Sequence, residues 1–254
     1  MKKNDSRVRI DKLLVERGLV PSRQRAQALL LAGKVLVNGQ KVEKSGANVD
    51  ALSEIRLLSD DLKYVSRGGL KLARALSHWK TDVAGKICLD VGTSTGGFTD
   101  CLLQHGAARV IAVDTGHGQI AFPLRQDSRV RLLENTNARY LTREQLAEEV
   151  EFIAIDVSFI SATLVLPAVV SAAFPQDVKE RSGRGIIILV KPQFEAGRER
   201  VGKGGIVRDD EVQQQAVEKV RGAVTTLGAV STEVIESPIL GVAGNREFLL
   251  HAKF

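Results

Sequence analysis

Short apolar runs recur through the last two thirds of the chain, and segments with helical spacing separate them. The runs lack polar alternation, which is typical of strands buried on both faces. Their alternation with helices predicts an α/β fold with a doubly wound, mostly parallel sheet that has an antiparallel strand near the C-terminus. We expect strands at residues 87–91, 109–114, 130–137, 151–159 and 185–191, followed by a closing pair at 232–237 and 246–254.

The helices expected between these strands carry their own start and stop signals. Thr142 and Gln145 form a capping box for a helix that ends near Glu149. Pro167 is expected to kink the helix over residues 160–173, and further helices are expected over 71–79 and 211–227. These elements account for most of the chain after residue 70.

The first sixty residues follow a different pattern. A short helical stripe over residues 10–14 stops at Gly18, and Ser22 is a good N-cap for a second helix. Asn38-Gly39 between two alternating runs is a strong hairpin signal, and a further strand is expected at 54–58. This order predicts a small N-terminal α+β domain.

Residues 59–70 contain acids, two basic residues and two glycines, which is typical of a linker. We therefore predict a small domain over 1–60, a linker over 61–70 and a larger domain over 71–254. Tyr64 is one of only two tyrosines in the chain, and we expect it to pack across the joint between the domains.

The composition is that of a globular protein, with 44% hydrophobic and 26% charged residues. Cys88 and Cys101 both lie in apolar elements, and we expect small core residues rather than a disulfide framework. The spacing of His and Cys offers no metal site. The N-terminus has no apolar signal region and no stretch is long enough for a membrane span, so a cytoplasmic protein is expected.

Positive charge is concentrated at the N-terminus. Residues 1–44 carry eleven Lys and Arg against four Asp and Glu, whereas the rest of the chain is nearly neutral. A basic domain joined to a neutral one favours contact with a polyanion. A solvated charged surface is the alternative.

Arg23 and Arg25 fall in the first turn of the second predicted helix, where the helix dipole disfavours cations. Two arginines beside free helix amides predict a phosphate site, and Lys34 would extend the same face. Each of these side chains could alternatively point into water. Taken together, their placement favours nucleic acid.

The segment LDVGTSTGGFTDCLL, residues 89–103, predicts a strand, a glycine-rich turn and a helix. It lacks the spacing and the lysine of phosphate-binding turns, and the Asp90 carboxylate would repel a pyrophosphate but could hold an amino group. That combination favours S-adenosylmethionine, with an ordinary βα turn as the alternative. The residues expected to hold this cofactor at the turn are Asp90, Gly92, Thr93, Ser94, Thr95, Gly96, Gly97 and Phe98.

Polar residues follow the other predicted strands. Asp114 ends the second strand, where an acid can bind ribose hydroxyls, and Asn135 ends the third, where an amide suits an adenine edge. Asp156 and Lys191 end the fourth and fifth strands, at the edge where open α/β sheets bind ligands. Glu247 is placed on the last strand.

The loop over residues 195–210 is rich in glycine and basic residues, and a mobile basic loop beside a cofactor is a reasonable substrate gate. An ordinary surface loop is the alternative. Together with the linker, it supplies further basic residues expected to contact a nucleic acid: Arg67, Arg198, Arg200 and Lys203.

Residues 8–50 resemble the alpha-L RNA-binding motif. Residues 9–14 match its pattern R-[IL]-D-x-x-L, and residues 22–39 match SRxxAxxLxxxGxVxVNG. The resemblance implies binding of structured RNA with no chemistry of its own, and it includes Arg9 among the RNA-contacting residues.

The larger domain resembles the Rossmann-like S-adenosylmethionine-dependent methyltransferases. Lys71, Asp156, Lys191 and Glu247, in that chain order, resemble the Lys-Asp-Lys-Glu tetrad of the FtsJ-type ribose 2′-O-methyltransferases. The slot Asp156-Val-Ser-Phe is not the [DN]-P-P-[YFW] of base-nitrogen methyltransferases, and neither cysteine is placed for attack on cytosine carbon five. A ribose hydroxyl must lose its proton as it attacks the methyl group, and a lysine can take that proton only in its neutral form. We expect Lys191 to be this base and Lys71 to orient the hydroxyl.

Motifs along the whole chain, among them YVSRGGLKL, DVSFIS, LVKPQFEAGR and GNREFLL, resemble the TlyA-type ribosomal RNA methyltransferases, historically named hemolysin A. The resemblance implies 2′-O-methylation of cytidine in ribosomal RNA within a ribosomal subunit. A cytolysin and a non-catalytic assembly factor stay as alternatives, whereas a pseudouridine synthase would need an RLD-type motif that is missing. The oligomeric state, the nucleotide and the subunit are not fixed by the sequence.

Overall fold

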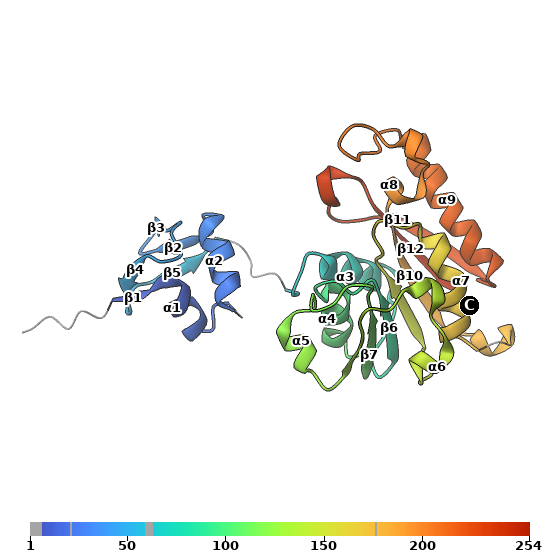
Figure 1. Cartoon of the computed structure of the whole chain (residues 1–254), viewed down its shortest axis with the longest axis horizontal. Coiled ribbons are helices and arrows are strands. Elements are labelled where there is room, and N and C mark those ends of the chain that lie inside the picture. The colour runs from blue at the N-terminus through green and yellow to red at the C-terminus, as the bar shows by residue number, and fades with distance from the viewer. Residues whose placement is uncertain (1–6, 21, 59–62, 176) are drawn as a thin grey trace, which may run out of the picture. The chain divides into compact units, whose positions relative to one another are not determined.

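The computed structural model describes residues 7–20, 22–58, 63–175 and 177–254, and the chain divides into two compact units, Met1–Lys63 and Tyr64–Phe254 (Figure 1). The N-terminal unit has short elements around a small apolar core. Its helices and strands are β1 (Arg7–Arg9), α1 (Ile10–Glu16), α2 (Arg23–Leu31), β2 (Val35–Val37), β3 (Gln40–Lys41), β4 (Asn48–Asp50) and β5 (Ile55–Leu57).

Local signals of the N-terminal unit are confirmed. The Ser22 side chain accepts a hydrogen bond from the backbone N–H of Arg25, as an N-cap should. Asn38 and Gly39 both have positive φ, and they join β2 to β3 in a hairpin. β5 completes a three-stranded sheet in the order β3-β2-β5. The pairing of β1 with β4 was not predicted, because both are short and mostly polar.

The C-terminal unit is built on a seven-stranded sheet, in the order β11-β12-β10-β9-β6-β7-β8. Five strands are parallel, and β12 pairs antiparallel with both β10 and β11, so the predicted fold class is confirmed. The elements are α3 (Gly68–Trp79), β6 (Ile87–Val91), α4 (Gly97–Gln104), β7 (Arg109–Val113), α5 (Phe122–Gln126), β8 (Val130–Leu133), α6 (Arg143–Leu146), β9 (Phe152–Ile155), α7 (Ala162–Ala173), β10 (Gly185–Val190), α8 (Pro192–Glu195), α9 (Asp210–Thr226), β11 (Ser231–Glu236) and β12 (Phe248–Lys253).

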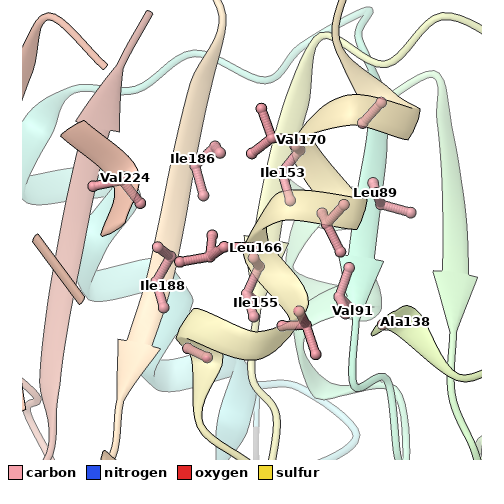
Figure 2. Close-up of a cluster of buried hydrophobic side chains, with 14 of the residues drawn as sticks. Leu89, Val91, Ala138, Ile153, Ile155, Leu166, Val170, Ile186, Ile188 and Val224 are labelled. Carbon is pink, nitrogen blue, oxygen red and sulfur yellow. The ribbon is translucent and has the colours of Figure 1, made fainter. Parts of the chain in front are cut away.

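Helices cover both faces of this sheet (Figure 1). α3 and α4 pack on one face, whereas α7 and α9 pack on the other. Figure 2 shows Leu166 and Val170 of α7 lying over the strands that carry Ile155 and Ile188. All four side chains are almost completely buried. Burial on both faces explains the unbroken apolar runs of the parallel strands.

Several boundaries differ from the sequence predictions. α3 begins at Gly68, inside the segment predicted as a linker. Tyr64 is buried in the core beneath α3 and α4 of the C-terminal unit, where a Cβ on Gly69 would lie 2.3 Å from its ring, so the predicted role across the joint is wrong. The helix expected to reach Glu149 ends at Leu146, because Ala147 adopts a left-handed conformation. Its capping box is confirmed.

Within the described residues no helix is both long and apolar enough to span a membrane.

Candidate active site

The strand-turn-helix segment lies at the carboxyl edge of the sheet. β6 ends at Val91, the chain turns through Gly92 to Gly96, and α4 begins at Gly97. Gly92 has φ +86°, and a Cβ there would lie 2.4 Å from the carbonyl oxygen of Asp156. Only glycine allows this approach, which brings the ends of β6 and β9 together.

A cavity of about 420 Å³ opens beside this turn. Asp114 lies on its wall immediately after β7, and its two carboxylate oxygens accept hydrogen bonds from the backbone N–H groups of Ser94 and Gly116, each at 2.7 Å. These bonds fix the carboxylate at the cavity wall. The other walls are formed by Val91, Gly92, Ser94, Val113, Thr115, Gln119, Thr136, Asn137, Ala138, Asp156, Val157, Ser158, Phe159, Ile160 and Val165.

This cavity fits S-adenosylmethionine in size and chemistry. Its volume lies within the range of small-ligand sites, about 300 to 1,000 Å³. The Gly92 turn leaves space that a Cβ would fill, Asp114 can accept from ribose hydroxyls, and Val113 and Ile160 offer apolar walls. Thr136 and Asn137 line it, whereas the predicted Asn135 is exposed and has no part in the wall.

The position of Asn135 follows from the length of β8. The strand ends at Leu133, earlier than predicted, and Asn135 then turns with φ +53°. The chain therefore presents Thr136 and Asn137 to the cavity instead. A pattern of polar residues after a strand could predict the segment but not which side chain faces inward.

Asp90 does not line this cavity either. Its side chain is completely buried between the sheet and α4, where Oδ2 accepts a hydrogen bond of 2.6 Å from the Thr99 hydroxyl. In the described part of the chain its Oδ1 has no hydrogen-bond partner. Burial raises the pKa of the Asp90 carboxyl to about 7, against the opposing hydrogen bond from Thr99.

A second cavity, of about 210 Å³, adjoins the first and shares Gly92, Ser94, Asp156 and Ser158 with it. All four residues of the predicted tetrad line it. They come from α3 and from the residues that directly follow β9, follow β10 and precede β12. The other residues on its wall are Ser66, Gly68, Thr93, Thr95, Gly97 and Phe98.

The tetrad forms two ion pairs. Lys71 Nζ lies 2.5 Å from Oε2 of Glu247, and both side chains are almost buried. Lys191 Nζ lies 2.6 Å from Oδ1 of Asp156, and it also donates a hydrogen bond of 2.7 Å to the Ser158 hydroxyl. The structure therefore gives each lysine its own carboxylate, and Asp156, the partner of Lys191, lies on the wall that the two cavities share.

Ser158 and Phe159 were missed in the sequence, although they follow Asp156 in the same segment. Phe159 is 92% exposed, has φ +63°, and packs against Phe194 with ring centroids 5.3 Å apart. An exposed aromatic ring in a left-handed conformation is unusual. The only sequence signal was an aromatic residue directly after a predicted strand end.

In the N-terminal unit, the predicted phosphate-binding residues divide into two groups. Asp11 is completely buried and accepts hydrogen bonds from Arg9 at 2.9 and 3.0 Å and from Arg23 Nε at 2.8 Å. A buried carboxylate therefore explains the arginine in the first turn of α2, and the guanidinium groups of Arg9 and Arg23 are only half exposed. Lys34 is exposed and Arg25 is half buried on the same unit.

The predicted basic residues of the C-terminal unit are exposed, but two have partners. Arg67 donates a hydrogen bond of 3.1 Å to the carbonyl of Leu240, and Arg200 donates to Gln215. The loop expected to be a mobile gate contains a short 3₁₀ turn at Arg198–Arg200, and Gly202 pairs with Ile206 in a tight hairpin that carries Lys203. It thus has defined local structure.

Two family profiles match the chain, FtsJ-like methyltransferase over residues 64–254 and S4 domain over residues 8–55. The 16S/23S rRNA (cytidine-2′-O)-methyltransferase TlyA of Mycobacterium tuberculosis (strain ATCC 25618 / H37Rv) is 44% identical over 245 residues, which are 96% of this chain and 89% of that protein. Hemolysin A of Brachyspira hyodysenteriae is 40% identical over 246 residues, 96% of this chain and 99% of that protein.

A solved structure from Streptococcus thermophilus, of a protein named as a hemolysin, is also similar. It has 41% sequence identity and a TM-score of 0.73, and the match covers 98% of this chain and 88% of the other.

Proposed function

This chain belongs to the FtsJ-like methyltransferase family, and from that membership we propose that it transfers the methyl group of S-adenosylmethionine to the ribose 2′-hydroxyl of a cytidine in ribosomal RNA. The family and the fold make the chain an S-adenosylmethionine-dependent methyltransferase. The acceptor rests on the Mycobacterium tuberculosis relative, whose name states that reaction.

The observation that carries the proposal is the convergence of Lys71, Asp156, Lys191 and Glu247 on one cavity beside the glycine turn. Single ion pairs at a sheet edge are common and need no catalytic explanation. Here two Lys-carboxylate pairs from distant parts of the chain line one small cavity. A ribose hydroxyl is a poor nucleophile, so its methylation requires a group that takes its proton.

The two adjoining cavities suggest a division of labour. S-adenosylmethionine, when bound, supplies an electrophilic methyl group on its sulfonium sulfur. The larger cavity would hold S-adenosylmethionine, with Asp114 at its ribose hydroxyls and the Gly92 turn beside the methionine part of the molecule. The smaller cavity would hold the acceptor ribose between Lys71 and Lys191.

We assign the base to Lys191 because its partner Asp156 lies on the wall common to both cavities, whereas Glu247, the partner of Lys71, lines only the smaller one. With S-adenosylmethionine bound in the larger cavity, Lys191 would take the proton of the 2′-hydroxyl as that oxygen accepts the methyl group. Ser158 and Asp156 hold the Lys191 nitrogen in place. Lys71 also lines the smaller cavity, where it orients the hydroxyl.

The remaining features are consistent with an RNA acceptor inside a ribosomal subunit. The S4 domain match covers the basic N-terminal unit, where Arg25 and Lys34 are available to phosphates. The exposed ring of Phe159 offers a surface on which an unstacked base can lie. A protein that modifies ribosomal RNA would act in the cytoplasm, where the subunits assemble.

The reaction can be tested with ribosomal subunits from cells that lack the protein. The full chain and labelled S-adenosylmethionine are added to each subunit separately, and mass spectrometry identifies the methylated nucleotide. We expect a 2′-O-methylcytidine. The substitution Lys191→Met should lower the transfer rate about 1,000-fold, the scale of general-base catalysis, with S-adenosylmethionine binding retained in calorimetry.

Lys86→Met is the matched control, because Lys86 precedes β6 at the opposite end of the same sheet. It should transfer methyl groups at the wild-type rate. Full activity of Lys191→Met would exclude the proposed chemistry. If Lys71→Met proved more damaging than Lys191→Met, the two lysines would have to exchange roles. S-adenosylmethionine binding without any transfer to either subunit would favour a non-catalytic assembly factor.

A further inference from the structure

The Glu247 carboxylate occupies space that exists only because residue 241 is glycine. A Cβ built on Gly241 would lie 1.9 Å from Oε1 of Glu247 and 2.5 Å from its Cδ. Real Cβ contacts are never that short, so any larger residue would push this carboxylate away. Gly241 does not have a positive φ, and its backbone would therefore accept alanine without strain. The glycine is required by the contact with Glu247 and not by its own conformation.

The loop from Leu240 to Asn245 is tied closed around that carboxylate. The backbone N–H of Gly241 donates a hydrogen bond of 2.8 Å to the carbonyl of Asn245, two residues before Glu247. The carbonyl of Leu240 accepts from Arg67, which lies one turn before Lys71 on the same side of α3. The loop is thus attached to the segment that carries the lysine of the pair.

The Asn245 side chain ties the loop to the basic hairpin as well. It is 2% exposed, its Oδ1 accepts a hydrogen bond of 3.0 Å from the backbone N–H of Val207, and its Nδ2 donates one of 2.9 Å to the carbonyl of Gly205. Buried side chains that satisfy two backbone groups at once hold loops in one arrangement. Asn245 therefore links the hairpin that carries Lys203 to the residues preceding Glu247.

We propose that Gly241 and Asn245 are positioning residues for methyl transfer, which fix the Glu247 carboxylate against Lys71. Gly241 leaves the space that the carboxylate fills, and Asn245 holds the loop so that this space stays beside α3. The proposal rests on the proposed function, because it assigns the two residues a role only through the tetrad. Neither residue lines either cavity, so neither touches cofactor or acceptor.

A double-mutant cycle tests whether Gly241 acts through Glu247. Gly241→Ala should lower kcat about 100-fold, since a misplacement of about 1 Å at a catalytic group costs that much. Glu247→Ala should cause a similar loss. In the Glu247→Ala background the Cβ meets no carboxylate, so adding Gly241→Ala should change kcat less than twofold.

Asn245 is tested with two substitutions. Asn245→Ala removes both side-chain hydrogen bonds, and Asn245→Asp keeps the acceptor for Val207 but loses the donor to Gly205. We expect a loss of kcat in both variants, because aspartate sets a buried carboxylate against the carbonyl of Gly205. The KM for S-adenosylmethionine should change less than threefold, because Glu247 does not line the larger cavity. This split between kcat and KM would not arise from general loss of folded protein.

Gly222→Ala is the control for a glycine-to-alanine change, because a Cβ at that position in α9 would meet nothing within 4 Å. It should leave kcat unchanged. Independent, multiplicative losses from Gly241→Ala and Glu247→Ala would overturn the proposal, as would wild-type kcat in Gly241→Ala or in Asn245→Ala. If Glu247→Ala itself kept full activity, the tetrad assignment under the proposed function would fail instead. If Gly241→Ala does not fold, the kcat and KM values of Asn245→Ala and Asn245→Asp test the proposal instead.

Discussion

Among the described residues, each of the two units buries one aspartate completely, and the two carboxylates are held in opposite ways. In the N-terminal unit, Asp11 accepts hydrogen bonds from Arg9, Arg23 and Gln27. The Arg9 guanidinium is the main reason that the pKa of the Asp11 carboxyl is held well below its usual range, in spite of its burial. Its charge is compensated.

In the C-terminal unit, the hydrogen bonds to the Asp90 carboxyl come from Thr99, and Oδ1 of Asp90 has no partner among the described residues. Burial raises its pKa to about 7, and the carboxylates of Asp156 and Asp114 add to the rise. The charged form of Asp90 is therefore costly at neutral pH, because the described groups that act on its pKa include no cation. Aspartate burial stabilises one unit and destabilises the other, according to the partners that the fold supplies.

The comparison of Asp11 with Asp90 shows which charged residues maintain the fold and which have no such explanation. The N-terminal unit directs two of its predicted RNA-binding arginines to its own carboxylate, so part of its basic character maintains its fold. The C-terminal unit keeps Asp90 behind the glycine turn without a cation, although a neutral side chain would be easier to bury. The predicted contact of Asp90 with the amino group of S-adenosylmethionine can be tested by substitution, because the side chain lines neither cavity.

Removal of the compensated charge should have the largest effect. Asp11→Ala leaves Arg9 and Arg23 facing an empty site, and we expect the N-terminal unit to lose about 3 kcal/mol, the lower end for a broken buried pair because both arginines are half exposed. Hydrogen exchange of the full chain would show faster exchange in residues 7–58 alone. The exposed Lys12→Ala is the control, and equal protection in both variants would contradict the structural role.

The contributions of Asp11 and Asp90 to the free energy of unfolding should change with pH in opposite directions. Asp11 has a lowered pKa, so its stabilisation is complete above the unfolded value of about 3.8 and is lost as pH falls below it. Asp90 has a raised pKa, so its own contribution to stability is most favourable below pH 3.8 and falls by about 1.4 kcal/mol for each pH unit up to about 7.

Asp90→Asn should abolish the second slope. We expect the variant to be more stable than the wild type at pH 8 and similar near pH 4, as measured by unfolding followed through hydrogen exchange of the C-terminal unit. S-adenosylmethionine affinity should stay within about threefold if Asp90 is only buried, whereas a loss of about 100-fold would show that it holds the cofactor (about 2.7 kcal/mol).

The smallest effect is expected for Thr99→Val, which removes the hydroxyl that donates to the Asp90 carboxylate with little change in volume. The variant should lose about 1 kcal/mol, more at pH 8 than at pH 5, because the hydrogen bond favours the charged carboxylate. Urea unfolding at the two pH values measures it. A loss that does not change with pH would show that Thr99 acts by packing alone.

The strand ends were the most predictable part of the site. β6 spans the residues predicted for it, and Asp156 and Lys191 directly follow β9 and β10 as expected. Parallel strands point their carboxyl ends to one edge, so polar residues that follow two of them meet there. Asn135 failed because the conformation of a turn selects which of several neighbouring polar residues faces inward.

The long-range partners could not be predicted from local pattern. Twelve positions separate Asp11 from Arg23, and their ion pair exists because α1 packs against α2. The steric requirement at Gly241 is likewise invisible in the sequence, because glycine in a loop usually reflects a positive φ, which this residue lacks. Such contacts depend on how elements pack and not on the residues within one element.

The sequence by itself determined the two kinds of unit, the parallel sheet and the types of residue at its carboxyl edge. Apolar runs of strands buried on both faces, and short turn motifs, can each be recognised within a few neighbouring residues. Only the tertiary structure decided how these residues pair. β12 runs antiparallel between β10 and β11, so the residue that precedes β12 lies at the carboxyl edge of the parallel strands. That strand direction brings Glu247 to Lys71 across 176 positions of chain, and with it completes the second ion pair of the cavity.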